Sequence, residues 1–206
     1  MIIAIDGLTA SGKGTLAKAL ASQYGLARLD TGALYRAVAL ALLEAGSDVH
    51  SAAAAQEAAR RLDLNAIDEY AIRSGAVGDA ASVVAADSGV RAILKDAQRA
   101  FARQPGGAVL DGRDIGTVIC PDADVKFFVI ASLQERARRR YAELVARGET
   151  VDLAAVTELV DARDKRDMAR PIAPLAKAPE AHVLDTTALT VEQSAAAARR
   201  IVEAML

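Results

Sequence analysis

Residues 2–15 constrain the fold more than any other stretch of the chain. The β-branched run from Ile2 to Ile5 predicts a buried strand, and apolar periodicity from Leu16 to Tyr24 predicts a helix shortly after it. Between them lies Gly7-x-x-x-x-Gly12-Lys13, a turn whose backbone N–H groups can converge on one anion at the positive end of the helix dipole. This order predicts a loop for the phosphates of a nucleoside triphosphate, with an ordinary strand–turn–helix unit as the alternative.

The residues after the second glycine fit the same chemistry. Lys13 supplies a mobile positive charge for the outer phosphates, and a hydroxyl at the start of the helix can bind Mg²⁺. Gly14 follows the lysine, so the hydroxyl comes one position late, on Thr15. We therefore expect ATP as the ligand and Mg²⁺ as the cofactor. The residues expected to bind ATP are Gly7, Leu8, Thr9, Ala10, Ser11, Gly12, Lys13, Gly14 and Thr15.

Length and composition exclude several other classes of protein. The 206 residues suit one α/β domain with a small insertion, and the net charge of −2 gives no general attraction to nucleic acid or anionic membranes. A single cysteine, Cys120, excludes an internal disulfide and fits a reducing compartment. No apolar run approaches about 18 residues. Because Met1 leads directly into the first strand, we expect a cytoplasmic protein without a signal peptide.

A second strand-to-helix transition follows the first. Leu26–Leu29 predicts a strand, and Asp30 and Thr31 are good capping residues for a helix that continues to Gly46. Arg36 lies in the first turns of this helix, where the dipole disfavours a positive charge unless an anion is bound nearby. The segment therefore predicts a phosphate contact at Arg36, with a plain helix start as the alternative.

The region from residue 47 to residue 90 is the least regular part of the chain. Ser82 and Arg91 are nine residues apart, so one continuous helix would place them on opposite sides. They can meet at a ligand only because Asp87-Ser88-Gly89 interrupts the helix, with Ser88 as a candidate cap for the next one. A helix hydroxyl and a surface arginine are the alternative. The predicted elements are a helix over Ala52–Leu62, one or two weak strands over Leu64–Ile72, a helix over Ala80–Ala86 and a helix over Val90–Arg103.

A third strand, Gly107–Leu110, ends at Asp111. Ligands of open α/β sheets gather at the carboxyl ends of the strands, so Asp111, Arg113 and Asp114 stand where chemistry is expected. Two aspartates acting as turn formers around an arginine are the alternative.

The last third of the chain predicts a strand over Val125–Ala131, a strand at Val183-Leu184 and three helices. Ser132-x-x-Glu135 and Thr190-x-x-Gln193 are capping boxes, and Asp152 is a further cap. Arg136, Arg138, Arg139 and Arg140 crowd the first of these helices, which in most proteins indicates a solvated face. On the second helix Arg163, Asp167 and Arg170 fall within about 60° of one another. An intrahelical ion pair accounts for Arg163 and Asp167 but not for Arg170.

Four segments together resemble the nucleoside monophosphate kinases, and most closely the bacterial cytidylate kinases. The glycine-rich loop alone is generic, whereas the other three segments are specific, and the four span nearly the whole chain in the order of the family. They are Gly12–Thr15, Asp30–Arg36, Asp111–Thr117 and Arg163–Arg170.

The resemblance implies a fold and a domain plan. The fold is a three-layer α/β P-loop kinase fold with a five-stranded parallel sheet, in a single domain over residues 1–206. A lid over roughly residues 136–170 would close over the donor phosphates, and residues 47–90 would form the insertion that binds the acceptor. Bacterial cytidylate kinases carry a larger, sheet-containing insertion at this place.

The same resemblance implies transfer of the γ-phosphate of ATP to CMP, and to dCMP. It implies small-molecule partners alone, with no nucleic acid and no membrane, and we expect a monomer. Asp111 would lie near Mg²⁺ through water, and the catalytic cations would be Lys13, Arg136, Arg140 and Arg170. The residues implied for CMP are Thr31, Arg36, Ser82, Arg91, Arg113, Asp114, Arg163, Asp167 and Arg170.

Three other functions remain open at the level of sequence. A related kinase of shikimate or dephospho-coenzyme A would share the loop but lack the base-binding pair Arg91 and Asp114. A non-enzymatic P-loop regulator is compatible with the reduced insertion. A nucleic-acid-dependent ATPase is disfavoured by the acidic balance and by aromatic residues at only 3% of the chain.

Overall fold

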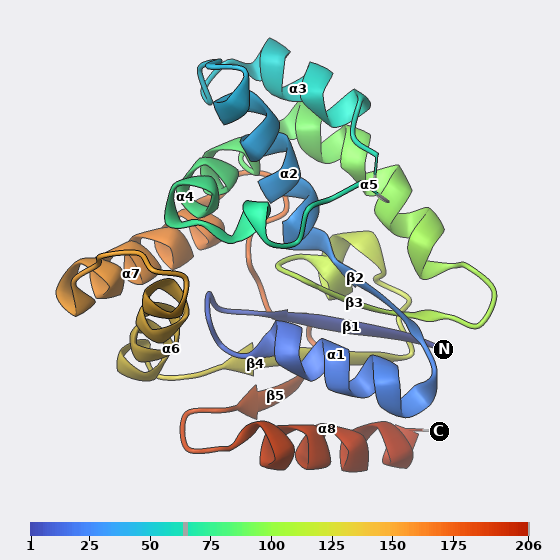
Figure 1. Cartoon of the computed structure of the whole chain (residues 1–206). Helices are drawn as coiled ribbons and strands as arrows, with labels where there is room; N and C mark the ends of the chain where they lie inside the picture. Colours follow the sequence, from blue (N-terminus) through green and yellow to red (C-terminus); the bar gives the residue numbers. More distant parts are fainter. Residues whose placement is uncertain (64–65, 206) are drawn as a thin grey trace. The chain divides into compact units, whose positions relative to one another are not determined.

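The computed structural model describes residues 1–63 and 66–205 (Figure 1). All strand pairs are parallel and the strand order is β2-β3-β1-β4-β5, so a crossover connection joins each strand to the next one in the chain. The carboxyl ends of all the strands consequently meet at one edge of the sheet. The predicted five-stranded parallel sheet is confirmed. Its strands are β1 (Ile2–Gly7), β2 (Ala27–Asp30), β3 (Ala108–Gly112), β4 (Val125–Ile130) and β5 (His182–Asp185).

The chain divides into two compact units. One unit joins Met1–Asp30 to Arg99–Leu206 and contains the whole sheet, and the other is Thr31–Gln98. No helix in the described ranges has the length and apolar character needed to cross a membrane. The helices are α1 (Lys13–Tyr24), α2 (Thr31–Glu44), α3 (Ala52–Arg60), η1 (Ala71–Arg73), α4 (Gly75–Val84), α5 (Ser88–Ala102), η2 (Ile115–Ile119), α6 (Leu133–Ala146), α7 (Leu153–Ala169) and α8 (Val191–Met205).

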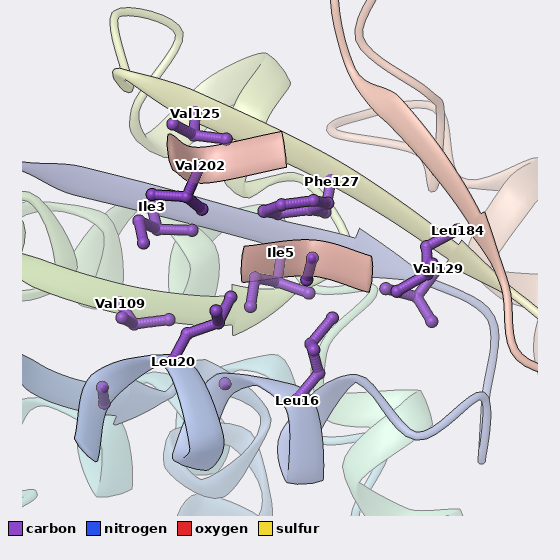
Figure 2. Close-up of a cluster of buried hydrophobic side chains, with 13 residues drawn as sticks. Ile3, Ile5, Leu16, Leu20, Val109, Val125, Phe127, Val129, Leu184 and Val202 are labelled. Atoms are coloured by element: carbon purple, nitrogen blue, oxygen red, sulfur yellow. The ribbon is translucent and has the colours of Figure 1, made fainter. Parts of the chain in front are cut away.

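Alternation along β1 gives the sheet two apolar faces. Ile3 and Ile5 pack with Leu16 and Leu20 of α1 and with Val202 of α8 (Figure 2). On the opposite face, the core around β1 and β3 includes residues of η2 and the last turn of α5. All these side chains are at most 3% exposed. Helices therefore cover both faces, as a three-layer α/β fold requires.

The ends of several helices follow the predicted chemistry. Gly25 adopts φ 62° after α1, a left-handed conformation that favours glycine. Asp152 accepts the N–H of Ala155 at the start of α7, and Thr190 and Gln193 form both halves of the capping box at α8.

The box at α6 is only half formed. Ser132 Oγ accepts the N–H of Glu135 at 3.3 Å, but the Ser132 N–H donates to Thr187 Oγ1 at 2.9 Å instead of to the glutamate. The Glu135 carboxylate pairs with Arg138 and Arg139.

The unit Thr31–Gln98 corrects two sequence predictions. No strand occurs over residues 66–72, where a turn leads into the short helix η1; residues 64 and 65 of the predicted strand lie outside the described residues. Asp87, not Ser88, caps α5, because Asp87 Oδ1 accepts the N–H of Val90 at 2.8 Å. Ser88 is itself the first residue of the helix.

Candidate active site

The predicted phosphate loop connects β1 to α1 in a tightly bonded turn. The Leu8 N–H donates to Val129 O, the Ser11 N–H donates to Leu8 O, and Lys13 Nζ donates to Leu8 O at 3.0 Å. Gly12 has φ 88°, and Ala10 has φ 57°, which is rare for a residue with a side chain. The loop therefore holds an unusual backbone conformation that its surroundings must stabilise.

Thr9 provides the first of these supports. Its N–H donates to Asp164 Oδ1 at 2.9 Å, its carbonyl accepts from Arg136 Nη1 at 3.1 Å, and its hydroxyl accepts from Arg113 Nη2 at 3.1 Å. Asp164 and Arg136 also form a buried ion pair with each other. Residues of α6, α7 and the segment after β3 thus fix one residue of the loop.

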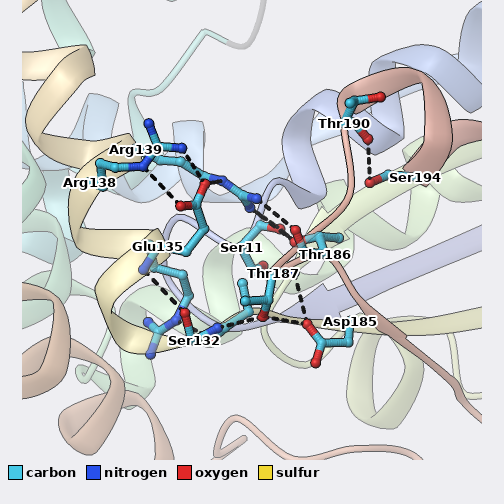
Figure 3. A network of polar contacts seen from close by, with 12 residues as sticks. Ser11, Ser132, Glu135, Arg138, Arg139, Asp185, Thr186, Thr187, Thr190 and Ser194 are labelled. Atoms are coloured by element: carbon cyan, nitrogen blue, oxygen red, sulfur yellow. Dashed lines mark hydrogen bonds and ion pairs between the residues drawn. The ribbon is translucent and has the colours of Figure 1, made fainter.

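Ser11 provides the second support (Figure 3). Its carbonyl accepts from Thr186 Oγ1 at 2.8 Å, and Arg139 donates to Thr186 Oγ1 at 3.0 Å and to Thr186 O at 2.7 Å. Thr186 follows β5 directly, and Arg139 lies on α6 with its Nε on Glu135 at 2.9 Å. Ala10 is therefore held between two anchored neighbours.

Lys13 and Asp111 are buried oppositely charged groups at the carboxyl ends of the strands. Burial lowers the pKa of Lys13 to about 7, with Arg113 acting in the same direction and Asp111 against it. Burial raises the pKa of Asp111 to about 6, aided by Asp30 and opposed by Arg28, whose Nη2 lies 3.3 Å from Asp111 Oδ1. Perturbed pKa values of two neighbouring buried groups are typical of a functional site.

The oxygen groups at the start of α1 suit Mg²⁺. A Cβ at Gly14 would lie 3.6 Å from Asp111 Oδ2, so this carboxylate reaches the first turn that also carries Thr15. Mg²⁺ is bound in many proteins by one or two such groups together with substrate phosphates. Within the described part of the chain, no three acidic, imidazole or thiol side chains form a metal cluster of their own.

A second charged cluster joins the segment after β3 to the end of α7. Arg113 Nε donates to Asp167 Oδ2 at 2.8 Å, and Arg170 Nη2 lies 2.5 Å from Asp167 Oδ1. Burial would raise the pKa of Asp167, but Arg113, Arg170 and Arg163 together hold it below its usual value. In the sequence, an intrahelical pair of Arg163 and Asp167 did not account for Arg170. The structure shows that Arg170 is a partner of Asp167.

Asp114 lies in the same loop, at the start of η2. It is only 6% exposed, and its carbonyl accepts the N–H groups of Val118 and Ile119 at 2.9 and 3.1 Å. Its bonding pattern makes η2 a π-helix, a form frequent at functional sites.

The arginines of the predicted lid differ in their surroundings. Arg136 is 5% exposed and donates from Nε to Ala131 O at 2.9 Å, in addition to its bonds with Thr9 and Asp164. Arg140 pairs with Glu143 at 2.9 Å on α6. Arg136 is therefore part of the support of the loop in this structure, whereas the partner of Arg140, Glu143, lies on its own helix.

The predicted residues of the unit Thr31–Gln98 come from α2, α4 and α5. Thr31 and Arg36 occupy the first turns of α2, and Ser82 on α4 is 4% exposed. Arg91 on α5 has its guanidinium carbon 5.6 Å from the centre of the Tyr35 ring and donates to Ala85 O at 3.3 Å. A break before α5 is present, but it spans residues 85–87 and not the predicted Asp87-Ser88-Gly89, because Ser88 and Gly89 already belong to α5.

A pocket of about 260 Å³ lies beside the phosphate loop. Thr15 and Leu16 of α1, Arg139 of α6, and Thr186 and Val191 around the β5–α8 connection line it. It combines apolar walls with a few polar groups directly next to the loop, as a small-molecule site does.

Sequence reasoning did not predict that Asp164, Arg139 and Thr186 contact the phosphate loop, although Arg139 belongs to the arginine-rich run noted in the sequence. Asp164 lies inside the segment that carries Arg163 and Asp167, so its place in that segment was the available signal. Nothing in the sequence around Thr186 distinguishes it from a turn residue.

Comparisons with known proteins identify the family of the chain. A model of the cytidylate kinase family matches residues 3–204. The chain is 56% identical over 205 residues to a cytidylate kinase of Rhodopseudomonas palustris (strain TIE-1), covering 100% of this chain and 97% of that protein. It is 60% identical over 203 residues to a cytidylate kinase of Methylocella silvestris, covering 98% and 94%.

A solved structure supports the fold. An uncharacterized protein from Eubacterium ventriosum ATCC 27560 matches with a TM-score of 0.59 at 15% identity, covering 100% of this chain and 98% of its own. The chain belongs to the cytidylate kinase family.

Proposed function

We propose that the protein transfers the γ-phosphoryl group of ATP to CMP, and to dCMP, releasing ADP and CDP or dCDP. Membership of the cytidylate kinase family supports the acceptor, and the phosphate loop supports a nucleoside triphosphate as donor. The attacking group is a phosphate oxygen of the acceptor, so the protein has to position and neutralise charge and supplies no nucleophile.

The donor phosphates would lie in the loop from Gly7 to Thr15. Its N–H groups and Lys13 would hold the β- and γ-phosphates, and phosphate binding would offset the effect of burial on the Lys13 ammonium. Thr15 and Asp111, the latter through water, would hold Mg²⁺, which would neutralise negative charge on the donor phosphates. The pocket beside the loop is a suitable place for the donor nucleoside.

The acceptor phosphate would be held by Arg36, Arg113 and Arg170, and the sugar by Arg163 and Asp167. The cluster of Arg113, Asp167 and Arg170 supports this assignment, because two cations and one carboxylate are already ordered at the carboxyl ends of the strands. Arg140 and Arg136 would complete the positive surroundings of the transferred group, and a closed lid would exclude water.

Base selection would rest on Ser82, Arg91 and Asp114. Cytosine offers an amino group at N4 and acceptors at N3 and O2, so a carboxylate accepts from N4 and an arginine donates to N3 and O2. Uracil reverses the pattern at N3 and position 4. A buried site then leaves polar groups unpaired on both sides, which discriminates strongly.

The observation that carries the proposal is the anchored phosphate loop with buried Lys13 and Asp111 at its end, in a chain of this family. A coupled assay of ADP release with ATP and CMP, dCMP, UMP, AMP or shikimate tests it. We expect turnover with CMP and dCMP that stops when EDTA removes Mg²⁺. Turnover with shikimate alone, or none with any acceptor, would overturn the proposal. Light scattering would test the proposed monomer.

A further inference from the structure

Asp6 directly precedes Gly7 of the phosphate loop, but its carboxylate forms hydrogen bonds with a different loop. Its Oδ1 accepts the N–H of Ile115 at 2.8 Å, and its Oδ2 accepts the N–H of Gly116, also at 2.8 Å. Asp6 is 3% exposed, so neither bond is shared with bulk water. One carboxylate therefore accepts hydrogen bonds from two consecutive amides that lie more than 100 residues further along the chain.

Those two amides immediately follow Asp114 and belong to the first turn of η2. The early N–H groups of a helix have no partner within the helix and need one from outside. Asp6 supplies it here, from the neighbouring strand β1, in which Asp6 is paired with Gly112 of β3. The loop that carries Arg113 and Asp114 is thus fixed at Gly112 by the sheet and at Ile115 and Gly116 by Asp6.

The space around this contact is closely filled. A Cβ placed on Gly116 would lie 3.2 Å from Lys126 Cδ and 3.4 Å from Asp6 Oδ2. The Lys126 ammonium, however, is directed to Pro121 O and to Glu180, so only its aliphatic stem packs here. Both oxygens of the Asp6 carboxylate therefore accept amide N–H groups, in closely packed surroundings.

We propose that Asp6 is a positioning residue for the acceptor, which sets Arg113 and Asp114 in place through the amides of Ile115 and Gly116. The inference rests on the proposed function, in which Arg113 holds the acceptor phosphate and Asp114 the base. Asp6 directly precedes the loop for the donor phosphates, yet it would affect binding of the acceptor.

Asp6→Asn is the direct test, because it keeps the shape of the side chain. The amide oxygen can accept one N–H, but the amide nitrogen then faces the other N–H as a second donor. Losing one buried bond of this kind corresponds to about a 5- to 30-fold change. We expect KM for CMP to rise by that factor and the preference for CMP over UMP to shrink, with KM for ATP within about twofold of the wild type.

Asp124→Asn is the matched control. Asp124 Oδ2 also accepts a strand N–H, that of Ile2 at 2.6 Å, but it is exposed and lies outside the site. The control should change none of the kinetic constants. Amide hydrogen exchange gives a second readout, in which Ile115 and Gly116 alone lose protection in Asp6→Asn.

Gly116→Ala covers the case in which Asp6→Asn does not fold. Its methyl group would lie 3.2 Å from Lys126 Cδ and 3.4 Å from Asp6 Oδ2, so it presses on the same contact while the carboxylate is kept. KM for CMP and the preference for CMP over UMP should therefore change in the same direction as in Asp6→Asn, but by less. If the variants fold and affect ATP and CMP equally, or affect neither, the inference is wrong. A wild-type protein inactive on CMP would instead overturn the proposed function.

Discussion

Arg113 and Asp167 meet in a 2.8 Å hydrogen bond between guanidinium Nε and carboxylate Oδ2, although 54 residues separate them in the chain. The same carboxylate pairs with Arg170. Two cations therefore stand side by side because one buried anion holds them. An acceptor phosphate binding to both would find their positions already fixed, which reduces the cost of ordering them on binding.

The first prediction concerns Lys13. Lys13→Ala should reduce kcat by at least about 100-fold, because preorganised charge on the transferred group contributes at least that much in comparable sites. Circular dichroism should show an intact fold. Lys18→Ala, an exposed lysine on the same helix, should leave kcat unchanged. Near-normal turnover of Lys13→Ala in the ADP-release assay would remove Lys13 from the mechanism.

The second prediction concerns Asp114. Asp114→Asn replaces an acceptor oxygen with a donor amide, so discrimination between CMP and UMP should fall by about 1–3 kcal/mol, the usual value of one polar contact to a base. The ratio of kcat/KM for the two acceptors measures it. Asp122→Asn, at an exposed carboxylate paired with Arg103, is the control. An unchanged ratio for Asp114→Asn would show that Asp114 does not contact the base.

The third prediction concerns the buried pair of Asp164 and Arg136. Asp164→Asn leaves the Arg136 charge buried without its anion, so the free energy of unfolding should fall by about 3–5 kcal/mol in urea denaturation. Lys165→Met, which breaks the exposed pair with Asp161, should cost less than about 1 kcal/mol. Equal losses in the two variants would mean that the buried pair contributes no more than a surface pair.

The fourth prediction is a pH dependence caused by Asp6. Burial raises its pKa to about 7, against the opposing effect of the two amide donors, whereas the pKa in the unfolded chain is about 3.8. Between these values the folded protein binds one proton more than the unfolded chain. The contribution of Asp6 to stability therefore falls as pH rises, by up to about 1.4 kcal/mol per pH unit.

Urea denaturation at several pH values between 4 and 8 measures this effect. The stability of the wild type relative to Asp6→Asn should decrease from pH 4 to pH 7 and then level off. A difference that is constant over this range would show that the Asp6 carboxyl does not titrate there.

The fifth prediction concerns the region over residues 47–90. A smaller insertion encloses the nucleoside less, while the phosphate clamp governs the chemical step. We expect a higher KM for CMP than in a cytidylate kinase with a sheet-containing insertion, and kcat within about 1–100 s⁻¹. Steady-state kinetics of both enzymes tests this. A kcat lower by several orders of magnitude with equal KM would show that the insertion assembles the catalytic geometry.

The strands and the long helices could be predicted from the sequence because local signals decide them. The β-branched run at Ile2–Ile5, the stop at Gly25 and the cap at Asp152 all depend on neighbours in the chain. Leu64–Ile72 was harder, because a few apolar residues without a clear period do not distinguish a strand from the turn and short helix observed over residues 66–73.

Most features of the site that could not be predicted from the sequence depend on contacts between residues far apart in the chain. Asp164, Thr186 and Asp6 act on backbone groups more than 100 positions away, and no spacing rule connects residues at that distance. The π-helix η2 depends in the same way on a distant residue, because Asp6 of strand β1 accepts the N–H of Gly116. The family resemblance predicted residues that contact ligands. It did not predict Asp6, Asp164 or Thr186, which hold the loops of the site in place.

Ala10 shows what the anchoring of the phosphate loop accomplishes. Glycine could adopt φ 57° without strain, but it would also give the unfolded and the empty loop many more conformations. Alanine narrows that choice, and the bonds on Thr9 and Ser11 offset its strain. The entropy that a flexible loop would lose each time a nucleotide arrives is in this protein lost once, during folding.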